Sequence, residues 1–398
     1  MDRSYWRTVS LVSLWQVSAS ICYYAVFAAT PFFRDEFGLS RFSVGFVVTA
    51  LTLGYALCLL PVGALIDRFG EKRSLTLGLI GLASGALLVA GAPTFALLLA
   101  AAFFLGSMYA SAIPGTNKAI YDGIEAGRQN FALGIKQVGV TAGSGISSLL
   151  VTGLAGILFW QAGFLIAAGF GILVAVVFAI FYSGVGDGGT AEYPDFRALS
   201  ENRPYRVLVL AGFFLGAAFF TTTGYTVLYV EESIGASVAF GGVVLALVQL
   251  FGSIGRIVTG WLSDALPGDP QVRIGSILIV QAFVGAVLFV IVAATDTPVN
   301  AAIAFSVLGF FILGNTGVYY SYMATLVSSD EMGGATAGGQ LSLVLGSVVA
   351  PPAFGFLADN VGYQGSWWLL AGGTLVAVAL LLYAIRLEPP TDEPAMQE

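Results

Sequence analysis

FSVGFVVTALTLGYALCLLPVGALI, residues 42–66, contains no charged side chain, and the charged cluster DRFGEKR follows it at 67–73. A helix rises about 1.5 Å per residue, so roughly 20 apolar residues cross the hydrocarbon core of a bilayer. This stretch therefore predicts a membrane-spanning helix that ends at a short charged loop.

The same alternation of long uncharged runs and short charged loops continues along the chain. Eight runs have the length of one span each: 8–33, 42–66, 207–230, 233–255, 274–295, 297–329, 332–358 and 360–385. Two longer runs, 74–117 and 137–186, each hold two spans, with breaks at Ala92-Pro93-Thr94 and near Trp160-Gln161-Ala162-Gly163. The prediction is an all-α membrane protein with twelve transmembrane helices.

Composition excludes a water-soluble enzyme. Of the 398 residues 57% are hydrophobic and 10% charged, whereas an ordinary soluble domain has roughly 25% charged residues. The net charge of −7 argues against a nucleic-acid partner. The chain has no His, and Cys22 and Cys58 are expected to be packing residues, so no cofactor and no metal site are predicted. The first apolar run is longer than a signal-peptide core and is interpreted as the first span.

Basic residues predict the orientation, because Lys and Arg accumulate on the cytoplasmic side. With twelve spans both termini lie on one side, and that side would hold twelve basic residues against two, Arg34 and Arg41, on the other. The chain is therefore expected to be a multi-pass protein of the plasma membrane with both termini in the cytoplasm.

Two halves echo each other. A polar, Gly- and Pro-containing stretch predicts a cytoplasmic linker at 184–206 between six-helix bundles at 1–183 and 207–387, with an acidic cytoplasmic tail at 388–398. The segments Gly63–Asp67 and Gly260–Asp264 match, and Gln137 matches Gln340 at the same offset of 203 that relates Gly143-Ser144 to Gly346-Ser347. Internal repeats of this kind are common in transporters, with the substrate site between the repeats near the midplane.

The segment GALIDRFGEKR, residues 63–73, resembles the signature loop between spans two and three of the major facilitator superfamily. The resemblance implies two pseudo-symmetric bundles that open alternately to the two sides. It also implies gating roles: Gly63 for close helix approach, Asp67 facing a helix end in the other half, and basic residues that latch the cytoplasmic side. The positions it assigns to gating are Gly63, Asp67, Arg68, Gly70, Lys72, Arg73, Gly260 and Asp264. The alternative is that the loop is only a basic anchor.

Departures from the family pattern disfavour a drug–proton exporter, because Ala102 and Ser144 replace residues that such exporters often carry. The stretch Arg128–Val140 is similar to superfamily permeases for cyanate, organic acids or unassigned metabolites. The place of Arg256 resembles the monocarboxylate and oxalate–formate transporters, in which it binds the substrate carboxylate.

Two cations lie inside predicted spans, where ionisable residues are costly and are functional candidates. Lys136 is eight residues from Arg128 and Arg256 is eight residues from Asp264, so each lies about 12 Å along its helix from a charged end. No Asp or Glu lies well inside a predicted span, so the expected counter-charge is an anionic substrate held between both cations. Two alternatives stay open: Lys136 could extend to the cytoplasmic surface, and Arg256 could bind helix-end carbonyls or Asp264.

Other polar residues within the spans are candidates for the same cavity, with interhelical hydrogen bonding as the alternative for each. The predicted substrate-binding set is Lys136, Gln137, Tyr225, Gln249, Arg256, Asn315 and Tyr319, and further cavity candidates are Gln16, Tyr23, Tyr24, Tyr320 and Gln340. The predicted function is secondary transport of a small organic anion, a carboxylate, by a monomer in the lipid bilayer, with or without a co-transported ion. The alternatives are a small inorganic anion such as nitrate or cyanate, a neutral metabolite or drug, and a receptor or scaffold without transport.

Overall fold

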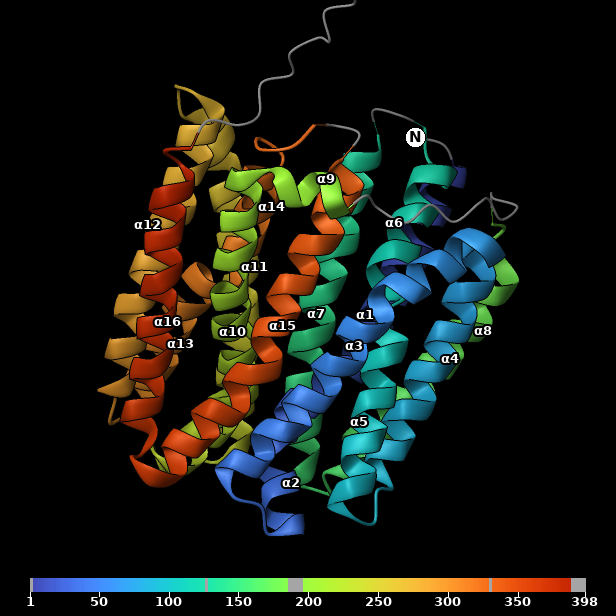
Figure 1. Ribbon diagram of the computed structural model, residues 1–398. Coiled ribbons are helices and arrows are strands. Elements are labelled where there is room, and N and C mark those ends of the chain that lie inside the picture. The colour runs from blue at the N-terminus through green and yellow to red at the C-terminus, as the bar shows by residue number, and fades with distance from the viewer. Residues whose placement is uncertain (1–2, 126–127, 185–195, 329–330, 388–398) are drawn as a thin grey trace, which may run out of the picture.

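The computed structural model describes residues 3–125, 128–184, 196–328 and 331–387, and in this part every regular element is a helix. Within these described ranges twelve helices are long and apolar enough to cross a membrane, as the uncharged runs predicted. Figure 1 shows them as two bundles that lean against each other, one blue to green and the other yellow-green to red. The predicted tail 388–398 and residues 185–195 of the predicted linker lie outside the described residues.

The first bundle holds six spans. They are α1 (Arg3–Ala28), α3 (Arg41–Phe69), α4 (Glu71–Ala90), α5 (Phe95–Tyr109) continued by α6 (Ala112–Gly123), α7 (Gln129–Ala155) and α8 (Gln161–Phe181). The predicted break before residue 95 is confirmed: the Thr94 side chain accepts from Leu97 N and so caps the first turn of α5. The first uncharged run extends past α1 into a separate short helix, α2 (Thr30–Phe37).

The second bundle follows the short helix α9 (Phe196–Glu201). Its spans are α10 (Arg203–Glu232), α11 (Val238–Ala265), α12 (Pro270–Ala293), the composite of α13 (Pro298–Leu308), π-helical η1 (Gly309–Leu313) and α14 (Asn315–Met323), then α15 (Met332–Asn360) and α16 (Tyr363–Ala384). Side-chain caps from Asn202, Ser237, Asp269 and Thr297 begin four of these helices. Both cysteines are free, and Cys22 is buried among packed helices, as expected.

The two faces of the molecule differ. The face on which α1 begins, α3 ends and α9 lies is called the N-terminal face, and the other is called the opposite face (Figure 1). Toward the opposite face the halves touch along α3 and α15 and along α7 and α11. A Cβ on Gly45 would lie 2.5 Å from the Pro352 backbone nitrogen, so the backbones of α3 and α15 meet there.

Ion pairs join the halves at the opposite face. The Glu232 carboxylate lies 2.6 Å from Arg41 Nε and 2.8 Å from Arg34 Nη1, and it accepts from Tyr363 OH at 2.7 Å. Asp359 accepts from the backbone nitrogens of Arg41 and Phe42 at 3.1 and 2.9 Å, so the second half caps the start of α3. These contacts are called the Glu232 cluster (Arg34, Arg41, Glu232, Asp359 and Tyr363), in which the first half supplies the cations and the second half the carboxylates.

Candidate functional site

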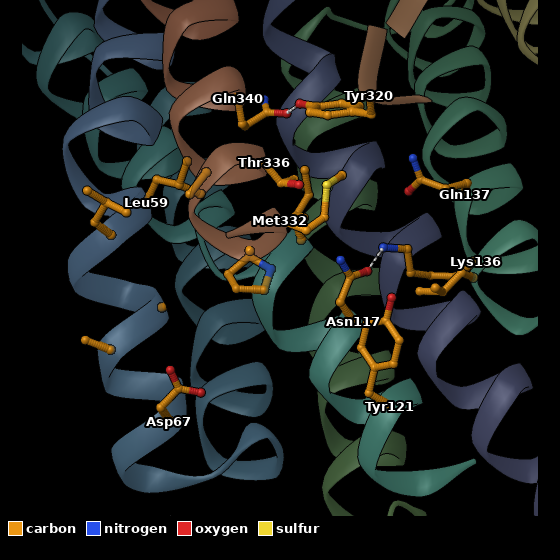
Figure 2. Close-up of a pocket in the computed structure, with 18 residues that line it drawn as sticks. Leu59, Asp67, Asn117, Tyr121, Lys136, Gln137, Tyr320, Met332, Thr336 and Gln340 are labelled. Carbon is orange, nitrogen blue, oxygen red and sulfur yellow. Dashed lines mark hydrogen bonds between the residues drawn. The ribbon is translucent and has the colours of Figure 1, made fainter. Parts of the chain in front are cut away.

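A large cavity lies between the halves at the N-terminal face. Its volume is about 690 Å³, and it is lined by α3, α6 and α7 from the first half and by α14 and the start of α15 from the second. Figure 2 shows its polar side chains. They are Asp67, Asn117, Tyr121, Lys136, Gln137, Tyr320, Thr336 and Gln340.

A smaller inner cavity of about 120 Å³ adjoins it and is lined by both halves. The first half contributes an aromatic cluster, in which Tyr23 stacks on Tyr109 with ring centroids 4.0 Å apart and Tyr55 packs edge-on against both. The second half contributes Arg256 among other residues. The buried hydroxyls of Tyr23 and Tyr55 have no hydrogen-bond partner among the described residues, so they are free to bond a ligand or water.

Four residues line both cavities and form the junction between them: Ile113, Gln137, Tyr320 and Gln340. The hydroxyl of Tyr320 on α14 donates to Gln340 Oε1 on α15. Figure 2 places this pair at one end of the large cavity and Asp67 toward the other, with Asn117 and Lys136 between them.

Arg256 is held at one edge of its guanidinium. Its Nε donates to the carbonyl of Leu313 at 3.1 Å, at the end of η1. Within the described residues it forms no ion pair, and its terminal nitrogens have no hydrogen bond to the protein. The carbonyl-binding alternative therefore applies to Nε, whereas the two terminal nitrogens remain available for a planar anion in the inner cavity.

Lys136 is buried, with 2% of its surface exposed, and its Nζ donates to Asn117 Oδ1 at 2.8 Å. Its ammonium points toward α6 across the large cavity (Figure 2) and does not extend to the surface. The sequence placed Lys136 and Arg256 in one cavity. In the structure they line two adjoining cavities, with Gln137 bordering both.

The other predicted binding residues lie elsewhere. Tyr225 donates to the carbonyls of Arg41 and Pro351 at 2.7 and 3.0 Å, close to the opposite face. Gln249, Asn315 and Tyr319 are buried in the second half and line neither cavity. Sequence reasoning missed several polar lining residues, among them Tyr55, Tyr109 and Asn117, although each of these three is a polar-tipped side chain within an uncharged run.

Comparison with known proteins agrees with this architecture. The family model described as Major Facilitator Superfamily matches residues 12–337. The chain belongs to the major facilitator superfamily. It is a multi-pass membrane transporter, and its solved structural neighbours share the fold. A bacterial homologue of the human lysosomal transporter Spinster, in an inward-facing and occupied conformation, superposes with a TM-score of 0.83 at 16% identity, covering 97% of this chain and 98% of that one.

Several curated relatives in the superfamily are named for organic anions. A hexuronate transporter of Bacillus subtilis (strain 168) is 25% identical over 391 residues, covering 92% of this chain and 90% of the relative. A probable sulfoacetate transporter of Cupriavidus necator is 24% identical with the same coverage, and a D-galactonate transporter of Escherichia coli O6:H1 is 21% identical, covering 90% of each chain.

Of the residues that the superfamily signature assigns to gating, Gly63 and Asp67 line the large cavity. A Cβ on Gly63 or on Gly260 would meet no atom within 4 Å, so neither glycine is in a close helix contact in this state. Asp67 lies 3.9 Å from Lys118 of its own half. Gly70 joins α3 to α4 with φ +83°, a conformation that favours glycine.

The remaining signature positions hold the loop. The Arg68 guanidinium lies over the Phe69 ring, and Lys72 and Arg73 lie in the first turn of α4, which begins at Glu71. Glu71 is buried and accepts from Tyr182 OH at 3.2 Å. Burial and the adjacent Glu71 carboxylate raise the pKa of Tyr182, so this phenol stays a donor. Asp264, the second-half counterpart of Asp67, forms no ion pair within the described residues.

Proposed function

We propose that this transporter carries a small organic anion whose carboxylate binds Arg256 in the inner cavity. The observation that carries the proposal is the guanidinium between the two halves, with its terminal nitrogens free and no counter-charge among the described residues. A cation inside a membrane-spanning bundle without a counter-charge is unfavourable, and a planar fork suits two parallel hydrogen bonds to a carboxylate. Relatives named for hexuronate, galactonate and sulfoacetate support the same class of substrate.

The aromatic wall favours an organic anion over nitrate or cyanate. Tyr23, Tyr55 and Tyr109 offer ring faces for carbon atoms and hydroxyls for polar substituents, which a small inorganic anion does not need. A carboxylate that bears hydroxyl groups, like those for which the hexuronate and galactonate relatives are named, would satisfy the unpaired hydroxyls of Tyr23 and Tyr55.

Transport proceeds in this proposal by alternating access of a monomer in the plasma membrane. The N-terminal face is cytoplasmic, as the distribution of basic residues predicts, so the structure represents the inward-open state. The Glu232 cluster and the contact of Gly45 with Pro352 close the outside. Gly63 and Gly260 contact no other helix in this state and would allow close helix approach when the inside closes. Lys136, Gln137 and the signature residues serve substrate passage and gating in the same cycle.

The test is uptake into proteoliposomes of glucuronate, galactonate, sulfoacetate, nitrate, cyanate and glucose. Carboxylates should be taken up and glucose should not, and repeating the assay with an imposed pH gradient detects a co-transported proton. Arg256→Lys should lower uptake at least about tenfold, because an ammonium cannot replace a bidentate pair and loss of one charged hydrogen bond costs about 1.5 kcal/mol or more. Uptake of glucose alone, or wild-type rates in folded Arg256→Lys protein, would contradict the proposal.

A further inference from the structure

Lys136 has an amino group whose charge, when it is protonated, is not compensated by any carboxylate among the described residues. Its side chain is 2% exposed, and its one hydrogen bond within the described residues goes to the neutral oxygen of Asn117 at 2.8 Å. An ammonium has three N–H donors, so two are left for a ligand or water in the large cavity.

A neighbouring lysine shows what compensation looks like. Lys118, next to Asn117 on α6, lies 3.1 Å from Asp122 and 3.9 Å from Asp67. Asp67 is the acidic residue that lines the large cavity, and it is thus engaged with Lys118. No described carboxylate pairs with Lys136, so its protonated form would make the cavity wall around it positive and would be stabilised by an anion.

Lys136 is also separated from Arg256. Arg256 lines the inner cavity of about 120 Å³ and Lys136 lines the large one of about 690 Å³. Between them lies the junction, where Tyr320 donates to Gln340 (Figure 2). An anion that passes from Arg256 to the N-terminal face must cross this junction and then meets Lys136 and Asn117.

We infer that Lys136 and Asn117 form a second anion site, which the substrate occupies between Arg256 and the N-terminal face. The inference rests on the proposed function, because it needs an anionic substrate. A carboxylate or sulfonate would accept from the Lys136 ammonium and from the Asn117 amide nitrogen, since the amide oxygen already faces Lys136. The two cationic sites, at Arg256 and at Lys136, would stabilise the anion in turn along its path past the apolar cavity walls. In this arrangement the anion is not held between Lys136 and Arg256 at the same time.

Two cationic sites predict an effect that depends on the side of the membrane. The half-saturation concentration for radiolabelled glucuronate is measured in right-side-out and in everted vesicles, which present the opposite and the N-terminal faces to the medium. Lys136→Met should raise the half-saturation concentration about tenfold from the N-terminal face and less than twofold from the opposite face. The reason is that a substrate entering from the N-terminal face reaches the Lys136 site first, whereas one entering from the opposite face reaches Arg256 first. Lys136→Arg should retain the wild-type value on both faces. Arg273→Gln is the control, since Arg273 lines neither cavity and bonds Leu266 O.

If Lys136→Met raises the half-saturation concentration equally from both faces, Lys136 belongs to the Arg256 site and the inference is wrong. Unchanged half-saturation concentrations on both faces would also overturn it. If Lys136→Met does not fold, Asn117→Ala should raise the same one-sided constant by a smaller factor. Wild-type transport in Arg256→Gln would instead refute the proposed function, whatever Lys136 does.

A binding measurement in detergent separates the sites without transport. In Arg256→Gln, glucuronate should still raise the melting temperature in a saturable way at millimolar concentrations, because the second site remains. The double variant Arg256→Gln/Lys136→Met should show no shift. No shift in Arg256→Gln up to about 50 mM, or an equal shift in the double variant, would show that Lys136 binds no anion.

Discussion

Glu232→Gln should shift the transporter toward the state that is open at the opposite face. The substitution keeps the shape of the side chain but removes the charge that meets Arg34 at 2.8 Å and Arg41 at 2.6 Å, across the boundary between the halves. These contacts exist only while that face is closed, so their loss raises the free energy of the closed state relative to the open one.

The magnitude follows from the geometry. Hydrogen bonds to charged groups contribute about 1.5–3 kcal/mol each when buried, and exposed ion pairs about 0–1 kcal/mol. The Glu232 side chain is 13% exposed, whereas Arg34 and Arg41 are 32% and 26% exposed, so we take about 2 kcal/mol for the pair of contacts. This corresponds to roughly a 30-fold change in the ratio of the two states.

The assay is electron–electron distance measurement between spin labels at Ala92→Cys and Asp296→Cys, in loops of the two halves at the opposite face, in a Cys22→Ala/Cys58→Ala background. Glu231→Gln is the matched control, because Glu231 forms no ion pair within the described residues. A longer distance should gain population in Glu232→Gln and not in Glu231→Gln. Identical distributions in the two variants would refute the role given to the Glu232 cluster.

Two further predictions concern the N-terminal face. Gly63→Leu should change the free energy of unfolding by no more than about 0.5 kcal/mol, because no atom lies within 4 Å of a Cβ at this position. The larger side chain should block closure of this face, so that substrate still binds while uptake falls at least about tenfold. Uptake at the wild-type rate would show that the helices never meet there. Asp67→Asn should slow transport without abolishing substrate binding and should reduce the population closed at the N-terminal face, measured by labels across that face, whereas an unchanged population would make Asp67 an ordinary loop residue.

Sequence predicted the number of spans because an uncharged run of membrane length has few alternative structures. It did not predict η1, because no proline marks that position. There the backbone of α11 meets the tenth span: a Cβ on Gly255 would lie 2.2 Å from Phe310 O, and Arg256 binds Leu313 O. A tertiary contact of this kind leaves no periodic signal in the sequence.

The site was predicted unevenly for a similar reason. Lys136 and Arg256, which line the two cavities, could be singled out because a charge inside a span is costly and makes a residue a functional candidate. Tyr225 could have been placed by depth, since it precedes Glu232 by seven residues and so lies only about 10 Å from the opposite end of α10. The division into two cavities depends on how each helix is rotated about its axis, and a single sequence does not determine that rotation.

The separation of charge in the Glu232 cluster makes the contact between the halves sensitive to salt. All of its cations come from the first half and all of its carboxylates from the second, and each is partly exposed at the opposite face. Dissolved salt shortens the reach of such charges from about 30 Å at 0.01 M to about 3 Å at 1 M. The electrostatic attraction between the halves is therefore stronger at low ionic strength than at high ionic strength. The ionic strength on the side of the opposite face thus affects how readily the transporter opens to that side.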